Sequence, residues 1–278
     1  MTQVTNDYNA NSIEVLEGLD AVRLRPGMYI GSTGTRGLHH ILWEIVDNAV
    51  DEAANGFATK VRVELHPDGS ASVEDNGRGI PVDIHPQLKV SGVEVVFTQL
   101  HAGGKFNNKN YSFSGGLHGV GASVANALSE WLTVEVYKDG KTYAMRFESY
   151  FDEAKNKIIS GAPVEHLRVV DEGTKKTGSR ITFLPDKRVF GKAEFNCETI
   201  LKRLKELAFL NKGIEFEFVN EKAGENEEGF SSFLYEGGLN DFVAYLNESK
   251  PLAFAKPVYF EGKNDVLQLQ CSFQYCET

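Results

Sequence analysis

Four polar side chains recur at every fourth position: His40, Glu44, Asn48 and Glu52. Residues spaced by four lie on one face of a helix, so these side chains form a polar stripe if the segment is helical. Asn48 offers a neutral oxygen to Mg²⁺, which prefers hard oxygen ligands and keeps several waters. Glu44 could take a proton from an attacking water, and His40 could orient or polarise Glu44. The simpler alternative is that the stripe is only the solvated face of the helix.

A second segment, from Asp75 to Pro81, combines a carboxylate with two glycines and an arginine. Asp75 is expected at the end of a strand, and the glycines permit tight backbone turns near a ligand. A buried carboxylate can accept a hydrogen bond from an adenine amino group, and this contact would select adenine. An ordinary turn is the alternative interpretation.

Residues 115–121, Gly-Gly-Leu-His-Gly-Val-Gly, precede a stretch from Ala122 to Leu128 that reads as the start of a helix. Glycines there let backbone N–H groups approach phosphates at a helix N-terminus. Lys105 could direct its ammonium group at a phosphate, and the glycines beside it suggest a mobile lid. The chain contains no P-loop pattern and no clear Rossmann site. A flexible surface loop is the alternative.

The elements that must position these side chains are predicted from apolar spacing. Apolar residues recur at helical spacing from Leu38 to Asn55, and Gly56 follows as a helix C-cap would. Alternating segments on both sides of turns predict hairpins over 60–75 and 132–147. Strands are further predicted at 180–184 and 214–219, with a helix at 198–210. The mixture predicts an α+β fold.

The polar stretch 220–229 is predicted to be a surface loop before a domain boundary, which divides the chain into 1–235 and 236–278. The second unit is predicted to hold a helix at 239–247 and strands within 258–275. About forty residues are few for an independent core, so this domain is expected to be cut short.

Net charge is −10, from 29 basic and 39 acidic residues. This sign is wrong for a surface that neutralises phosphates along a duplex, so other parts of a larger protein are expected to hold any DNA. The three cysteines lack C-x-x-C spacing, which argues against a disulfide framework or a structural zinc site. No signal peptide, transit peptide or transmembrane run is evident, which predicts a cytoplasmic protein with no membrane partner.

Four motifs occur in order along the chain, at residues 44–53, 75–81, 100–106 and 114–121. Together they resemble the GHKL-type ATPase of the B subunits of bacterial type II DNA topoisomerases, which are DNA gyrase and topoisomerase IV. The runs Arg-Leu-Arg-Pro-Gly-Met-Tyr-Ile-Gly at 23–31 and Tyr-Glu-Gly-Gly at 235–238 extend the resemblance over nearly the whole chain.

The resemblance implies a two-layer α/β sandwich of the GHKL (Bergerat) type with a mixed, mainly antiparallel sheet, followed by the start of a truncated ribosomal-S5-like transducer domain. ATP and Mg²⁺ are the implied ligands. Glu44 would be the general base, His40 its helper, Asn48 the Mg²⁺ ligand and Asp75 the adenine partner. The other implied nucleotide-binding residues are Glu52, Arg78, Gly79, Ile80, Pro81, Lys105, Tyr111, Gly116, Leu117, His118, Gly119, Val120, Gly121 and Thr177.

Partners are implied as well. Tyr8 and Ile13 match an N-terminal arm, about residues 1–20, that reaches a second copy of the chain when ATP binds. Arg78, Pro81 and Lys138 would border the groove for aminocoumarin-type inhibitors. The full enzyme would join the topoisomerase A subunit in an A2B2 complex and act on DNA.

Two departures from the family pattern are expected. The segment 149–163 is expected to be a longer turn than in many relatives, without a functional account. A Gln-x-Lys loop whose lysine contacts the γ-phosphate, and the DNA-gate portion, are not found in this sequence, so turnover is expected to be slow.

Three interpretations follow. The leading one is an ATPase whose nucleotide-driven dimerisation gates DNA strand passage, as gyrase with negative supercoiling or alternatively as topoisomerase IV with decatenation and relaxation. The second is an ATP-gated dimerisation module with little turnover. The third is another GHKL function, such as a chaperone, mismatch-repair protein or histidine kinase, and the runs at 23–31 and 235–238 speak against it.

Overall fold

The longest helix, α3 (Thr35–Ala54), forms where apolar residues recur at helical spacing. The structure is a computed structural model that describes residues 18–100, 121–224, 229–264 and 267–277. Gly56 follows α3 with a φ of 80°, and its N–H donates to the carbonyl of Ala53 at 2.9 Å. The predicted helix and its glycine cap are therefore confirmed. The apolar face of α3 is buried through Leu38, Ile41, Leu42, Ile45, Val46, Ala49 and Ala53.

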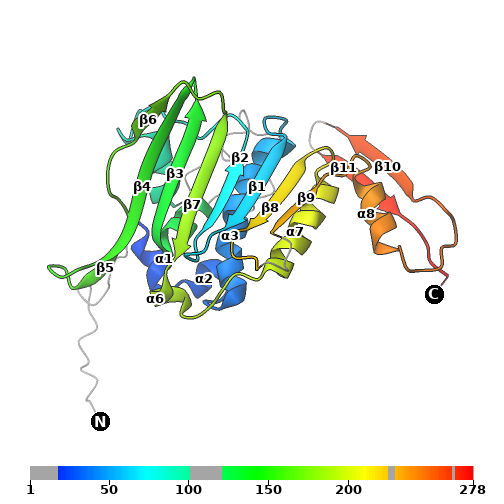
Figure 1. Cartoon of the computed structure of the whole chain (residues 1–278), viewed down its shortest axis with the longest axis horizontal. Helices are drawn as coiled ribbons and strands as arrows, with labels where there is room; N and C mark the ends of the chain where they lie inside the picture. Colours follow the sequence, from blue (N-terminus) through cyan, green and yellow to red (C-terminus); the bar gives the residue numbers. More distant parts are fainter. Residues whose placement is uncertain (1–17, 101–120, 225–228, 265–266, 278) are drawn as a thin grey trace, which may run out of the picture.

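Within the described residues, nine strands form one sheet in the order β5-β4-β3-β7-β2-β1-β8-β9, with β6 paired to β4 (Figure 1). Neighbouring strands run antiparallel except β1 and β8, which are parallel. The predicted mixed, mainly antiparallel sheet is confirmed. The strands are β1 (Lys60–Leu65), β2 (Ala71–Asp75), β3 (Ser129–Lys138), β4 (Lys141–Asp152), β5 (Lys157–Pro163), β6 (Arg168–Glu172), β7 (Gly178–Pro185), β8 (Glu215–Asn220) and β9 (Phe230–Phe233).

Both predicted hairpins are present. β1 and β2 pair through a turn that contains Gly69, whose φ is 95°. β3 and β4 pair around Asp139 and Gly140, which have φ values of 53° and 75°. Two successive left-handed residues match the right-handed twist of the flanking strands, so an Asp-Gly pair is favoured at this turn.

Helices cover one face of the sheet, which gives the two layers visible in Figure 1. α3 packs on β1 and β2 and against α5, and α5 also contacts β3, β4 and β5. α7 packs on β8 and β9. The other helices of this layer besides α3 are α1 (Asp20–Leu24), α2 (Gly27–Ile30), α4 (Gly92–Thr98), α5 (Gly121–Ala127), α6 (Lys187–Phe190) and α7 (Cys197–Leu210).

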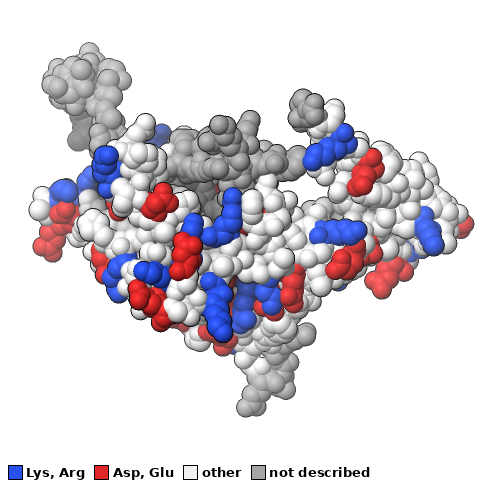
Figure 2. Space-filling view, turned by 90° about the horizontal axis from the view of Figure 1, so that it is seen from above, with Lys and Arg blue, Asp and Glu red and all other residues white. Residues whose placement is uncertain are grey.

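The opposite face of the sheet carries charged side chains that alternate in sign. Arg180 contacts Glu64, and it also contacts Glu74 at 3.0 Å, while Lys60 contacts Glu217 at 2.7 Å. Figure 2, a view from above, shows basic and acidic groups interspersed on the face it presents. The described residues visible in this view form no extended patch of positive charge for a duplex.

The segment 149–163, which the sequence predicted to be a turn, forms the end of β4 and the whole of β5, paired as a hairpin. β4 continues to Asp152, and β5 returns beside it after a short turn in which Asn156 has a φ of 48°. Ser149 and Ser160 are buried. Lys157 reaches α1, where its ammonium group lies 2.7 Å from Asp20.

The last described residues form α8 (Leu239–Leu246) and a separate two-stranded sheet of β10 (Val258–Lys263) and β11 (Gln268–Phe273), as predicted. α8 meets α7 through aromatic rings. Phe209 stacks on Tyr235 with centroids 3.7 Å apart and on Phe242 at 5.1 Å. The boundary at residue 235 remains a prediction. No helix in the described ranges is long and apolar enough to span a membrane.

Candidate active site

The polar stripe of α3 is half-buried along its length. His40, Glu44, Asn48 and Glu52 all have intermediate exposure, although the opposite face of the helix is fully buried. His40 Nε2 lies 3.2 Å from Glu44 Oε1. This contact gives Glu44 a fixed neighbour, which is the arrangement that a positioned general base requires.

Glu44 lies directly against the first residue of α5. A Cβ placed on Gly121 would come 1.9 Å from Glu44 Oε2 and 2.8 Å from Glu44 Cβ. Only glycine leaves room for the carboxylate at this distance. The end of the glycine-rich segment and the stripe on α3 therefore meet in space.

Asp75 ends β2 in a buried position, with 8% of its surface exposed. Its Oδ1 accepts a hydrogen bond from the N–H of Gly77 at 2.8 Å. Burial raises the pKa of Asp75 to about 7, and the charges of Glu52 and Glu74 add to the increase. β7 crosses very close to this residue, since a Cβ on Gly178 would lie 1.9 Å from the carbonyl oxygen of Asp75.

Glu52, at the other end of the stripe, holds Arg78. Arg78 Nη2 lies 2.6 Å from Glu52 Oε1, and Arg78 Nε donates to Glu52 Oε2 at 3.1 Å. The guanidinium group also lies 3.5 Å from the centre of the Phe57 ring. Gly77 packs beside Glu52, because a Cβ there would be 3.0 Å from Glu52 Oε2. The α3 stripe and the 75–81 segment thus form one continuous surface.

The backbone of the 75–81 segment is fixed by β7. Gly79 has a φ of 77°, and a Cβ there would lie 3.0 Å from the carbonyl oxygen of Gly178. The Ile80 N–H donates to Ser179 Oγ at 2.9 Å. Thr177 Oγ1 donates to the carbonyl of Asn76 at 3.2 Å, which brings Thr177 to the same rim.

Two further predicted residues border this surface. Pro81 is exposed and packs against Gly92, where a Cβ would come 2.5 Å from the Pro81 carbonyl oxygen. Lys138 ends β3 and is half-exposed, and the residue before it, Tyr137, pairs with Gly178. The other predicted residues lie outside the described ranges: Tyr8, Ile13, Lys105, Tyr111, Gly116, Leu117, His118, Gly119 and Val120.

Residues 33–188, more than half of the chain, match the family described as histidine kinase-, DNA gyrase B-, and HSP90-like ATPase. The chain belongs to this ATPase family. Membership makes ATP its ligand. The α3 stripe, the 75–81 segment and the start of α5 all fall within the matched residues.

The chain is similar along nearly its whole length to B subunits of type II topoisomerases. It is 47% identical to the B subunit of the type 2 topoisomerase of Aquifex aeolicus, with 99% of this chain and 33% of the relative covered. It is 48% identical to the B subunit of DNA topoisomerase 4 of Streptococcus pneumoniae (97% and 39% covered). It is also 48% identical to the B subunit of DNA gyrase of Thermotoga maritima (98% and 41% covered). Because the identity to the topoisomerase 4 subunit and to the gyrase subunit is the same, these comparisons do not tell which of the two this chain resembles more.

A solved structure confirms the fold. The 43K ATPase domain of Thermus thermophilus gyrase B, in complex with an aminocoumarin, matches with a TM-score of 0.78 and 41% sequence identity. The match covers 93% of this chain and 62% of that chain. The ATPase spans 33% to 41% of the length of the three relatives named above.

Sequence reasoning missed two residues that support the site of this ATPase. Phe57 stacks under Arg78, and Ser179 holds the Ile80 backbone. Phe57 carries little signal, because single apolar residues at a helix end are common on protein surfaces and Phe57 itself is exposed. Ser179 carries none, since its role arises only where β7 pairs with β2.

Proposed function

We propose that this chain binds ATP along the polar stripe of α3 and hydrolyses it with Mg²⁺. The observation that carries the proposal is the position of Glu44, which lies between His40 and the start of α5 at Gly121. Asp75 lies at the other end of the stripe, beside Glu52. Glu44 and Glu52 are eight residues apart, about 12 Å along a helix axis. A nucleotide laid along the stripe has its base at Asp75 and its terminal phosphate at Glu44.

Adenine recognition is assigned to Asp75 and its neighbours. The buried carboxylate accepts a hydrogen bond from the exocyclic amino group of adenine, which guanine lacks at the corresponding position. Gly79 and Ile80 bring backbone close to the base, while Arg78, Pro81 and Thr177 border it. Glu52 holds Arg78 in place through two contacts.

The donor set fits a magnesium ion. Asn48 lies on the stripe between Glu44 and Glu52, so its amide oxygen faces the same surface as the two carboxylates. Mg²⁺ in nucleotide sites takes one or two protein oxygens and completes its shell with phosphates and water. A single amide ligand is therefore sufficient. When bound, the ion neutralises charge on the phosphates.

Glu44 orients a water and accepts its proton, and His40 holds the carboxylate in the required position. The phosphate contacts are assigned to Lys105 and to backbone N–H groups of residues 117–121, and Tyr111 is assigned a contact with the nucleotide. These assignments rest on the family motif and on the placement of Gly121 against Glu44.

In a longer protein, the proposed activity is part of a type II topoisomerase. ATP binding joins two copies through the arm that holds Tyr8 and Ile13, and this dimer gates DNA passage together with the topoisomerase A subunit, in the cytoplasm. The 48% identity to both gyrase and topoisomerase IV subunits supports either activity, negative supercoiling or decatenation. Aminocoumarins bind at Arg78, Pro81 and Lys138, and the similarity to a Thermus thermophilus domain that was solved with such an inhibitor supports this assignment.

Calorimetric titration with a non-hydrolysable ATP analogue, with and without Mg²⁺, tests the binding site. We expect binding that needs Mg²⁺, and no binding of the matching GTP analogue. Equal affinity for both analogues would remove the adenine role of Asp75. Light scattering on the same samples tests dimerisation, which is expected only with the ATP analogue.

A measurement of phosphate release distinguishes the two hypotheses, an ATPase and an ATP-gated dimerisation module. Turnover above background with Mg²⁺ and ample ATP supports hydrolysis by this chain. Tight analogue binding and dimerisation without any phosphate release would leave only the module.

A further inference from the structure

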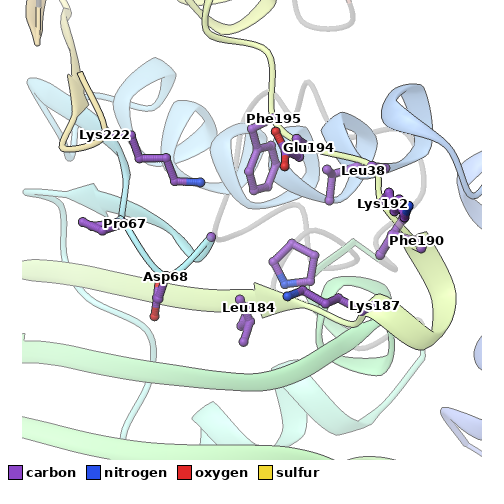
Figure 3. A pocket seen from close by; sticks show the side chains of 14 residues that line it. Leu38, Pro67, Asp68, Leu184, Lys187, Phe190, Lys192, Glu194, Phe195 and Lys222 are labelled. Carbon is purple, nitrogen blue, oxygen red and sulfur yellow. The ribbon is translucent and has the colours of Figure 1, made fainter. Parts of the chain in front are cut away.

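A pocket of about 440 Å³ opens near the N-terminal half of α3 and the β1–β2 turn (Figure 3). The turn contributes Pro67, Asp68 and Gly69. The end of β7 and the chain after it contribute residues 184–195 except Asp186, Arg188 and Val189. Its volume falls in the usual range for small-molecule sites. None of the residues assigned to ATP lines it.

The inner wall of this pocket is apolar. Leu38 of α3 and Phe190 of α6 are buried, and Leu184 and Phe195 are half-buried. Figure 3 shows the Phe195 ring beside Leu38, above Leu184. These side chains offer a flat apolar group a surface to pack on.

Three lysines surround the apolar wall: Lys187, Lys192 and Lys222. None of their ammonium groups forms an ion pair or hydrogen bond with another described residue. In Figure 3, Lys222 and Lys187 extend over the pocket from two sides, while Lys192 lies at its far end. Arg188, which lies between lining residues in the sequence, is by contrast paired with Asp186 at 2.7 Å. Among the residues that the structure describes, the pocket thus gathers three lysines without an ion-pair partner, on a chain whose net charge is −10.

The acidic residues of the lining offset this charge only in part. Asp68 accepts hydrogen bonds from the Ser70 N–H at 2.8 Å and from Ser70 Oγ at 2.6 Å, and it points away from the pocket in Figure 3. Glu194 is the other carboxylate of the lining. Among the described lining residues, three ammonium groups thus stand against two carboxylates, which leaves one net positive charge.

We propose that this pocket binds a small amphipathic anion, namely an aromatic ring that carries a carboxylate. The ring packs on Leu38, Leu184 and Phe195, and the carboxylate lies between the ammonium groups of Lys187 and Lys222. A carboxylate between two exposed lysines gains from both charges without full desolvation.

Phe195, which lines the pocket, also contacts His39 near the start of α3. The His39 ring meets the Phe195 ring edge-on at 5.7 Å, and His39 Nδ1 lies 2.8 Å from the Thr35 carbonyl oxygen. The Asn196 N–H donates to His39 Nε2 at 3.0 Å. Leu38 also lines the pocket, so a ligand that packs on Phe195 and Leu38 should change the NMR shifts of the Leu38 methyl groups.

Methyl NMR with 2-naphthoate as the probe tests the proposal, with a saturating non-hydrolysable ATP analogue present so that the nucleotide site is occupied. We expect the Leu38 and Leu184 methyl resonances to shift and to saturate. In the Lys187→Gln/Lys222→Gln double variant, the Kd should rise about fivefold or more. Lys192→Gln is the matched control and should change the Kd by less than about twofold.

2-Naphthylmethanol, which has the same rings without the charge, completes the test. Weaker binding of the alcohol to the unsubstituted protein supports the lysine pair. Equal binding of alcohol and naphthoate, equal losses in all lysine variants, or shifts that spare Leu38 and Leu184 would overturn the proposal. All three substitutions are at exposed side chains, so the variants are expected to fold.

Discussion

Glu44 is the residue on which the proposed hydrolysis most directly depends, because it is held by His40 at 3.2 Å and faces the start of α5. Glu44→Gln keeps the size of the side chain and removes its basicity. We expect phosphate release to fall about 10²–10⁴-fold, since a general base contributes by that much. The Kd for the ATP analogue should change by less than about threefold, because the base acts in the transition state.

Glu198→Gln, at the exposed first turn of α7, serves as the control and should leave both quantities unchanged. If Glu44→Gln weakened analogue binding as strongly as it slowed turnover, Glu44 would be a binding residue and not the base.

Asp75 should make two properties depend on pH in opposite directions. As the pH rises, the stability of the protein without nucleotide should fall and its affinity for adenine should increase. Burial raises the pKa of Asp75 to about 7, so the folded protein keeps a proton that the unfolded chain releases near pH 4. The stability from this group is complete below about pH 4 and is lost as the pH rises through 7. Adenine binding favours the ionised acceptor, so affinity should fall as the pH drops below 7.

Asp75→Asn removes the titration and replaces an acceptor-only group with one that also donates. We expect ATP affinity to fall about tenfold or more. Urea unfolding without nucleotide should become less sensitive to pH between 5 and 8. A variant with unchanged affinity and an unchanged pH profile would exclude Asp75 from adenine recognition.

At the scale of elements, α5 can approach α3 only because its first residue is glycine. A Cβ on Gly121 would meet Glu44 Oε2 at 1.9 Å, so Gly121→Ala must displace the carboxylate or the helix. Overpacking of this kind costs about 1–3 kcal/mol. We expect turnover to fall more than analogue affinity. Gly27→Ala, in α2, meets no atom within 4 Å and is the control.

A buried ion cluster joins α1 to the chain after β7. Asp186 is 1% exposed and is contacted by Arg23 and Arg188. Burial alone would raise the pKa of Asp186, but the hydrogen bonds from Arg188 and Arg23 outweigh it and hold the pKa below its ordinary value. Asp186→Ala leaves Arg23 unpaired and should cost about 3–5 kcal/mol in urea unfolding at pH 7.

Because this pKa is lowered, the contribution of Asp186 is present above about pH 4 and is lost as the pH falls through the folded-state value. Glu165→Ala breaks the exposed pair with Arg168 and should cost less than about 1 kcal/mol. Equal losses in the two variants would mean that burial adds nothing to the Asp186 cluster.

Elements with local signals could be predicted from the sequence. α3 and both hairpins follow from apolar spacing and from turns at Gly69 and Asp139. β6 is fully exposed, so it carries no alternation between buried and exposed positions that could reveal it. α4 was also missed, although Ser91 accepts from the Glu94 N–H at 3.2 Å, and Ser-x-x-Glu is a helix-start pattern.

At the scale of the whole molecule, the site depends on contacts between distant parts of the chain. β1 pairs in parallel with β8, about 150 residues later, and Asp75 meets Gly178 across β2 and β7. Spacing alone predicts none of these pairings, because they arise from the sheet order. The motifs indicated the site residues through a family resemblance, which requires no knowledge of that order.

Side chains are buried to different extents in different elements, so the free energy of local opening should differ between these elements. The central strands β2 and β7 are largely buried, with Val73 at 1% and Phe183 at 0% exposure. All six residues of β10 are exposed, and α8 buries none of its residues. Regions with few buried apolar contacts open locally at low free-energy cost. Hydrogen exchange of this chain should therefore be roughly 100-fold faster or more in β10 and β11 than in β2 and β7.

Phe209→Ala, which removes the ring that stacks on Tyr235 and Phe242, should speed exchange in α8 further and leave β2 unchanged. Equal protection across all these elements would mean that the chain unfolds as a single cooperative unit.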